Sequence, residues 1–218
     1  QAKMDLDERN FYQEYCAEFV TSSGLIYYAF SRELSVEPIE DNGGTLHIGM
    51  DFNLDPISAV ICLRHGQDLL AIDEIVMYGS NTDEMVAEIK DRYPNRHCII
   101  YPDPASRQRK TSAGGRTDLS ILQNAGFSVK AKKAHPLVRD RINAVNSRLL
   151  SGDGERHLFV SSKCKHTIKS LERQTYKEGT SIPNKDGTDH MNDALGYLVE
   201  YLFPIRTEYN TPQPTRWT

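Results

Sequence analysis

The sequence predicts a mixed α/β domain, in which one central β-sheet carries helices on both of its faces. Three strand-like runs follow one another with only short turns between them, which is typical of an antiparallel meander. Farther along the chain, shorter strand-like runs alternate with segments of helical periodicity, which is typical of parallel strands joined by helices. The length of 218 residues suits one large domain, alone or with an appendage.

The first half of the chain supplies the meander and the segment that leads into it. A short amphipathic helix is expected over residues 5–19 and a short strand over 25–30, and an acidic, turn-rich stretch follows at 38–44. The meander is expected at three runs, 46–52, 58–64 and 69–77. We therefore expect residues 1–44 to form a linker segment and the main domain to span residues 45–203.

The second half supplies the alternating elements. Periodic apolar residues predict helices over 83–93, 117–125, 136–150, 163–176 and 189–202. Apolar or β-branched runs predict strands over 97–101, 127–130 and 158–160. Residues 204–218 contain three prolines, so we expect a flexible tail there.

The composition argues against several classes of protein. No apolar run approaches the ~20 residues of a membrane span, and the first residues do not resemble a signal peptide. The four cysteines are widely spaced and form no CxxC pair. This spacing argues against a disulfide scaffold or a zinc site and favours a reducing cytosol. The chain begins with Gln1 instead of an initiator Met, so we expect a fragment of a longer polypeptide.

The net charge of −4 hides an uneven distribution along the chain. Residues 1–103 carry a balance of −12, residues 104–179 carry +10, and residues 180–218 carry −2. A basic middle inside an acidic chain favours one positive face that binds a polyanion. The alternative is that these charges scatter over a solvated surface.

Three acidic positions lie where apolar elements begin or end. Asp51 and Asp103 each close an apolar strand, and Asp193 lies in the first turns of the last predicted helix. A carboxylate at the tip of a buried strand is costly unless a cation or a donor meets it. If the sheet places the two strand tips side by side, a helix that begins near them brings the third acid close. Three such carboxylates form a site for Mg²⁺ or Mn²⁺, as one or two ions, and indicate a metal-dependent nuclease.

Each acid also has a plain structural alternative. Asp51 or Asp103 can cap the turn that follows its strand, and Asp189 can cap the last helix. His190 and Asp193 are three residues apart on that helix and can share one site. We therefore expect His190 as an auxiliary ligand, with Asp189 and Asn53 as supporting groups beside the metal.

Together these segments resemble the C-terminal nuclease domain of the large terminase subunit of tailed double-stranded DNA bacteriophages, within the ribonuclease H-like superfamily. The resemblance covers roughly residues 5–203. It rests on Gly49-Met50-Asp51-Phe52-Asn53, on the strand end at Tyr101-Pro102-Asp103, on Arg141-Ile142-Asn143-Ala144-Val145-Asn146, and on Asp189-His190-Met191-Asn192-Asp193-Ala194-Leu195-Gly196-Tyr197. Residues 12–20 are similar to the stretch that joins the packaging ATPase of the family to its nuclease.

The resemblance implies a ribonuclease H-like fold and an endonuclease of the headful-packaging type. Such an enzyme cuts concatemeric viral DNA with little sequence preference while a procapsid fills. It implies Asp51, Asp103 and Asp193 as catalytic metal ligands, and His190 matches a position that ligates metal in some relatives. The implied partners are double-stranded DNA, an ATPase domain, a small terminase subunit and a portal ring, but no membrane. The implied location is the host bacterial cytoplasm, transiently at the procapsid portal.

Several further expectations concern DNA and ATP. No GxxxxGK[ST] loop occurs, so we expect no ATPase activity from this chain. The fragment itself is expected to be monomeric. Basic residues near the acids predict contacts with the phosphate backbone. They are Arg107, Arg109, Lys110, Arg116, Lys130, Lys132, Lys133, Lys165 and Lys169. A solvated loop at 107–116 with incidental charge is the alternative.

Other functions share part of this pattern. A junction resolvase or an integrase-like enzyme of the same superfamily would carry the three acids without the segment at residues 5–20. A catalytically silent DNA-docking module would carry them as structural groups. A sugar-kinase-like ATPase also opens with a strand that bears an Asp, but the glycine-rich phosphate loops of that fold are absent from the sequence.

Overall fold

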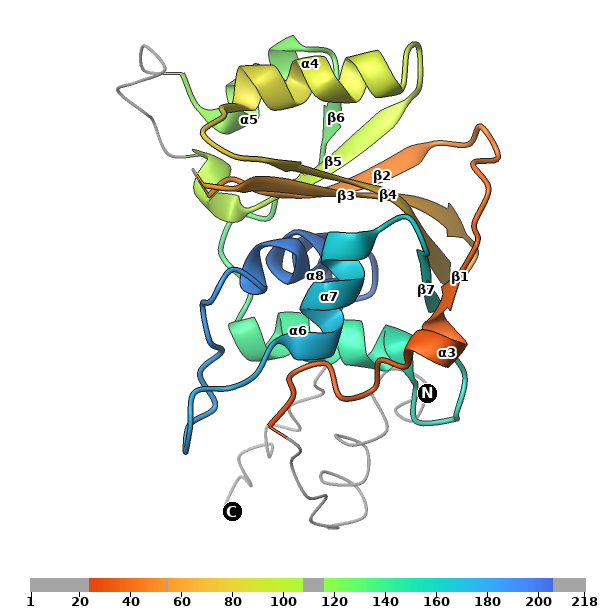
Figure 1. Ribbon diagram of the computed structural model, residues 1–218. Helices are drawn as coiled ribbons and strands as arrows, with labels where there is room; N and C mark the ends of the chain where they lie inside the picture. Colours follow the sequence, from red (N-terminus) through yellow and green to blue (C-terminus); the bar gives the residue numbers. More distant parts are fainter. Residues whose placement is uncertain (1–23, 54, 108–115, 206–218) are drawn as a thin grey trace, which may run out of the picture.

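One mixed sheet runs through the middle of the domain in the computed structural model, which describes residues 24–53, 55–107 and 116–205 (Figure 1). Within these residues the strand order is β1-β7-β4-β3-β2-β5-β6. The strands are β1 (Val36–Glu37), β2 (Leu46–Asp51), β3 (Ile57–His65), β4 (Asp68–Met77), β5 (Cys98–Pro102), β6 (Ser128–Val129) and β7 (Leu158–Ser161). β2, β3 and β4 pair antiparallel, and the other neighbours pair parallel. The predicted combination of a meander with parallel strands is confirmed.

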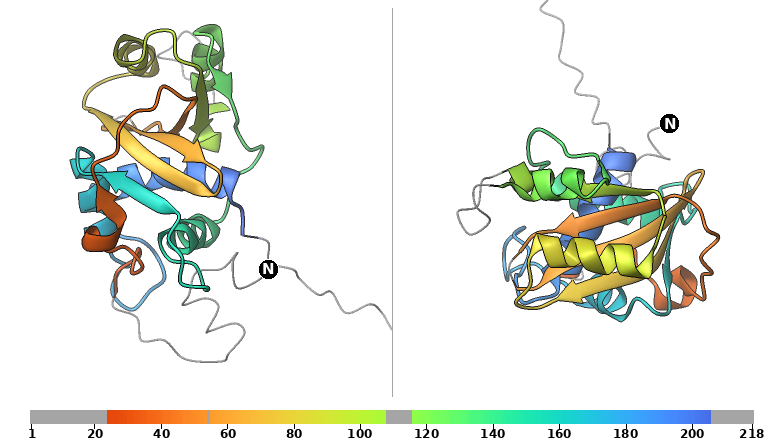
Figure 2. Two further views of the ribbon diagram at one scale, coloured as in Figure 1. Left: turned by 90° about the vertical axis from the view of Figure 1, so that its right-hand side faces the viewer. Right: turned by 90° about the horizontal axis from the view of Figure 1, so that it is seen from above.

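Helices cover both faces of this sheet, as Figures 1 and 2 show. One face carries α4 (Thr82–Arg92) and α5 (Asp118–Asn124), and the other carries α6 (Val138–Leu149), α7 (Lys165–Arg173) and α8 (Asp189–Leu202). The short elements are α3 (Arg32–Ser35) and the 3-10 helix η1 (Pro104–Arg107). None of the helices in the described ranges combines the length and apolar character needed to cross a membrane.

The central meander strand β3 is buried on both faces over residues 57–63, which explains its almost continuous apolar sequence there. Alternate side chains of β3 enter two different cores. Val60 and Cys62 join the cluster under α6, α7 and α8, whereas Ala59 and Ile61 join the cluster under α4 and α5. The predicted three-layer arrangement with helices on both faces is therefore confirmed.

The segment before the meander departs from the prediction. Residues 25–30 form turns with one isolated bridge from Leu25 to Thr175, and no strand forms there. Ile26 and Tyr27 are buried in the core beneath α6 and α8, and β1 adds a strand beside β7. The predicted strand over 25–30 is wrong because these apolar side chains pack on helices. The expected boundary at residue 45 also does not separate this segment from the sheet.

The helix α8 lies against β2 at Gly49, where the backbones approach closely. A Cβ atom at Gly49 would lie 2.1 Å from the carbonyl oxygen of Ala194 and 3.0 Å from the Cβ of Leu198. Only a residue without a side chain fits this contact. The contact fixes how α8 sits over the end of β2, and it thereby fixes where the first turns of α8 lie.

Replacing Gly49 by Ala is expected to lower the free energy of unfolding by at least about 3 kcal/mol, because backbone must move to accept the methyl group. Gly196→Ala is the matched control. Its Cβ would meet nothing closer than Arg141 Cβ at 3.6 Å, so a stability change between zero and a gain of about 1 kcal/mol is expected in the helix interior. Urea unfolding measures both, and equal values for the two variants would contradict this packing.

Candidate metal centre

Two parallel strands end side by side at one end of the sheet, on the left in Figure 1. β2 ends at Asp51, and β5 ends one residue before Asp103. The ends are in register, because Met50 pairs with Pro102 and the Asp103 N–H donates to the Met50 carbonyl oxygen at 3.0 Å. Side chains alternate along a strand, so Asp51 shares the face on which Gly49 meets α8. The predicted meeting of the two strand ends is confirmed.

Asp51 is held by groups from two elements. Its side chain is only 3% exposed. Oδ2 accepts a hydrogen bond from Asn53 Nδ2 at 2.7 Å and lies 3.2 Å from His190 Nδ1. The hydrogen bond to Asp51 raises the pKa of His190, and burial opposes this effect. His190 of α8 and Asn53 therefore both lie against the Asp51 carboxylate at the end of β2.

Asp193 lies one turn farther along α8 and pairs with a buried arginine. Arg141 Nη1 of α6 donates to Asp193 Oδ1 at 2.8 Å. The Arg141 guanidinium also lies over the ring of Tyr197, with its central carbon 4.3 Å from the ring centroid. Burial raises the pKa of Asp193, Arg141 opposes this, and the negative charge of Asp51 adds to the increase. The two carboxylates of Asp51 and Asp193 are thus electrostatically coupled across the interface of β2 and α8.

Asp103 completes the group from the side of β5. Its Oδ1 lies 3.3 Å from Nδ1 of His135, in the segment that leads into α6. Tyr197 links it to the other acids: burial raises the pKa of Tyr197, Arg141 opposes this, and Asp103, Asp193 and Asp51 each raise it further. The negative charges of all three predicted carboxylates therefore raise the pKa of the Tyr197 phenol.

The chemistry of these donors fits a hard divalent cation, since Mg²⁺ and Mn²⁺ prefer oxygen ligands and accept imidazole less readily. Among the described residues, however, no three His, Cys, Asp or Glu side chains stand in position to hold a metal ion. The expected convergence of the three carboxylates around a metal ion therefore stays a prediction. Each acid has a partner of its own among the described residues: Asn53 and His190 at Asp51, His135 at Asp103, and Arg141 at Asp193.

Asp189 begins α8 but does not cap it. The N-cap residue is Thr188, whose side chain makes no capping hydrogen bond. Asp189 is buried, and its Oδ1 accepts the Gly187 N–H at 3.2 Å. The helix-capping alternative for Asp189 is therefore wrong, because the carboxylate turns back to the loop before the helix.

Five of the basic residues predicted to contact DNA fall into two groups. Lys130, Lys132 and Lys133 follow β6, in the segment whose His135 reaches Asp103. Lys165 and Lys169 are exposed on α7. The first group follows β6, the neighbour of β5 in the sheet, whereas Lys169 lines one hollow together with Ser58 of β3 and Val76 of β4. Arg109 and Lys110 lie outside the described residues, and Arg107 ends η1.

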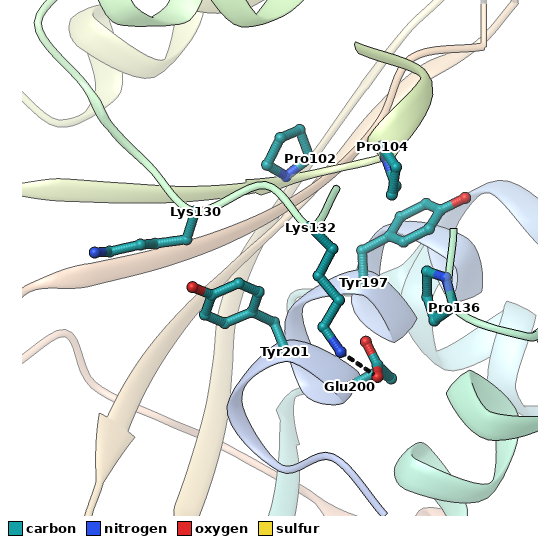
Figure 3. Close-up of a pocket in the computed structure, with 8 residues that line it drawn as sticks. All are labelled: Pro102, Pro104, Lys130, Lys132, Pro136, Tyr197, Glu200 and Tyr201. Atoms are coloured by element: carbon teal, nitrogen blue, oxygen red, sulfur yellow. Dashed lines mark hydrogen bonds and ion pairs between the residues drawn. The ribbon is translucent and has the colours of Figure 1, made fainter. Parts of the chain in front are cut away.

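Two of these cations already have acidic partners. The ammonium of Lys132 pairs with the carboxylate of Glu200 on α8, whereas Lys130 extends away from that pair (Figure 3). Arg116 lies 3.1 Å from the Asp83 carboxylate. An ion pair of this kind reduces the charge that a residue offers to DNA, so Lys130 is better placed than Lys132 for a phosphate contact.

Sequence reasoning missed the role of three residues at this centre. In the sequence Arg141 is only part of a resembling segment, although an arginine next to Ile142 on an otherwise buried helix face signals a buried partner. Tyr197 has the pattern of a packing position on the last helix. His135 belongs to no ligand pattern in the sequence, because only the fold brings its segment to Asp103.

Solved structures share this fold at low sequence identity. A large terminase from a thermophilic bacteriophage matches with a TM-score of 0.69 and 19% identity, over 88% of this chain and 48% of that one. The large terminase nuclease domain of P22 matches with a TM-score of 0.64 and 16% identity, over 84% and 96%. The large terminase nuclease of the thermophilic phage G20c with bound magnesium matches with a TM-score of 0.56 and 14% identity, over 83% and 98%. This chain therefore spans about half the length of the first of these proteins.

Sequence comparisons give a family but no individual relative. No curated protein sequence matches the chain. The family model described as the terminase RNaseH-like domain matches residues 48–202, from β2 to the last turn of α8. This range contains the whole candidate metal centre and most of the sheet, so the chain belongs to the terminase RNaseH-like domain family.

Proposed function

We propose that this chain is the nuclease part of a phage large terminase. In this proposal it is a divalent-metal-dependent endonuclease that cuts concatemeric double-stranded viral DNA, with little sequence preference, during packaging into procapsids. The observation that carries the proposal is the junction of β2, β5 and α8. There the strand ends at Asp51 and Asp103 are in register, and His190 Nδ1 of α8, one turn before Asp193, lies 3.2 Å from Asp51 Oδ2. The metal-bound nuclease domains of SPP1 (manganese) and G20c (magnesium, cobalt) support it.

In this proposal Asp51, Asp103 and Asp193 hold Mg²⁺ or Mn²⁺, and His190 is an auxiliary ligand. A bound ion of this kind lowers the pKa of a coordinated water and stabilises negative charge on the oxygens of a phosphodiester. The protein supplies orientation. Asn53 and His190 fix one oxygen of Asp51, and Arg141 fixes one oxygen of Asp193, which leaves the other oxygen of each carboxylate for a ligand.

The DNA duplex is proposed to lie across the acids, between the segment at Lys130 and Lys133 and the helix α7 with Lys165 and Lys169. These exposed ammonium groups suit phosphate oxygens of any sequence. In the whole protein an ATPase domain, a small terminase subunit and a portal ring are the proposed partners. The proposed place of action is the procapsid portal in the host cytoplasm.

Cleavage of supercoiled plasmid tests this function directly. With Mg²⁺ or Mn²⁺ the chain is expected to convert the plasmid to nicked and then linear DNA, with no preferred cutting site, and EDTA is expected to abolish the reaction. Binding of DNA without cleavage in either metal, together with no thermal stabilisation by Mn²⁺, would instead support the DNA-docking alternative. Cutting restricted to branched DNA would support a junction resolvase.

A further inference from the structure

A hollow of about 250 Å³ lies beside the metal centre, on the side of β3 and β4. His190 belongs to both, because it contacts Asp51 and also lines the hollow. The other walls come from α7, from the turn after β4 and from the loop before α8. The lining residues used below are Ser58, Val76, Tyr78, His166, Lys169 and Asp186.

The floor of the hollow continues the row of residues that carries the acids. Asp51 pairs with Ser58 of β3, and Ser58 pairs with Val76 of β4. Directly paired residues of antiparallel strands place their side chains on the same face. A DNA strand with its phosphate at Asp51 and Asp103 therefore has the hollow as its next position in the direction of β4.

Ser58 gives this floor an unsatisfied polar group. Its side chain is fully buried, and within the described residues its Oγ has no hydrogen-bond partner. A buried hydroxyl without a partner costs free energy, and proteins rarely keep one without a reason. Because Ser58 lines the hollow, a sugar or phosphate oxygen placed there would satisfy it.

The walls offer groups that suit one nucleotide. His166 and Lys169 are three residues apart on α7, and both line the hollow. At the rim, Tyr78 exposes 69% of its surface, which suits contact with a sugar or stacking on a base. Asp186 carries the opposing charge among the lining residues, and it already accepts hydrogen bonds from the backbone and hydroxyl of Thr188 at 3.1 and 2.6 Å.

We propose that this hollow binds the nucleotide next to the cleaved phosphodiester bond. Lys169 and His166 contact its phosphate, Ser58 contacts a sugar or phosphate oxygen, and Tyr78 contacts its sugar or base. The inference rests on the proposed nuclease function. It adds a defined subsite to that function. DNA affinity then depends on the residues that line the hollow and not only on the positive charge of the surface.

The test measures the affinity of the chain for a short fluorescein-labelled DNA duplex in EDTA, by fluorescence anisotropy. Lys169→Ala and Tyr78→Ala are each expected to weaken binding about tenfold, through a lost phosphate contact and a lost ring contact. Lys165→Ala is the matched comparison, since it removes the same charge from the same helix but does not line the hollow. It is expected to weaken binding only about twofold.

Ser58→Ala separates ligand binding from folding. Since the hydroxyl has no partner in the described structure, its removal is expected to leave the melting temperature unchanged or higher, while DNA binding weakens about threefold or more. If the wild-type chain cuts plasmid, two results would overturn the subsite. One is an equal loss of DNA affinity in Lys169→Ala and Lys165→Ala, and the other is unchanged DNA affinity in Ser58→Ala and Tyr78→Ala. A wild-type chain that neither cuts plasmid nor binds the duplex would instead contradict the proposed function, and the subsite with it.

Discussion

Asp51→Asn is expected to reduce plasmid cleavage in Mg²⁺ or Mn²⁺ by at least about a thousandfold, the scale seen when a central electrostatic group is removed from an active site. The side chain of Asp51 lies at the junction of β2, β5 and α8 and is only 3% exposed. The substitution keeps its shape, and the new amide oxygen can still accept from Asn53. What it removes is the negative charge that a divalent cation requires.

The measurement combines cleavage rates with melting temperatures in the presence and absence of Mn²⁺. The melting temperatures separate a loss of metal binding from a loss of folding. Asp51→Asn is expected to lose the Mn²⁺-dependent rise in melting temperature while it retains the metal-free melting temperature within a few degrees. Asp91→Asn is the matched control, since Asp91 is exposed and directly precedes the last residue of α4, on the opposite face of the sheet. It is expected to cut like the wild type. Full activity of Asp51→Asn would show that this carboxylate is not part of the nuclease centre.

The sequence was sufficient to predict the three meander strands because they are bounded by strong turn signals. β2, β3 and β4 lie within one residue of the predicted runs at each end, and α8 spans the predicted 189–202. The short edge strand β1 escapes prediction, since two residues of Val and Glu carry no periodic pattern. The apolar residues 25–30 predict a strand wrongly, because a short apolar run has the same appearance whether it packs on helices or joins a sheet.

The candidate site could be predicted only as far as it follows from strand ends. Asp51 and Asp103 meet because parallel neighbours end together, which a topology derived from sequence can foresee. The partners of Asp103 and Asp193 could not be foreseen. His135 and Arg141 reach Asp103 and Asp193 from a loop and a helix whose approach depends on side-chain packing across the whole domain.

The ion pair of Arg141 and Asp193 gives the second large expected effect, this time on folding. Arg141 is 9% exposed and Asp193 is 25% exposed at the side chain. In the metal-free chain, Arg141→Met would leave the Asp193 carboxylate beside Asp51 without its counter-charge. Removing one partner of a buried pair typically costs about 3–5 kcal/mol. Because a quarter of Asp193 reaches water, we expect about 3 kcal/mol, measured by urea unfolding in EDTA.

A double-mutant cycle decides whether that loss reflects the unpaired charge. Asp193→Asn removes the negative charge that Arg141→Met leaves without a counter-charge. The double variant is therefore expected to lose at least about 1 kcal/mol less free energy of unfolding than the sum of the two single losses. Arg32→Met serves as control, since the Arg32–Glu172 pair has an arginine side chain 60% exposed and should be worth under about 1 kcal/mol. Strictly additive losses for Arg141 and Asp193 would mean that Arg141 stabilises α6 and α8 through its contact with Tyr197 alone. In that case the arginine would not be what holds Asp193 in place beside Asp51.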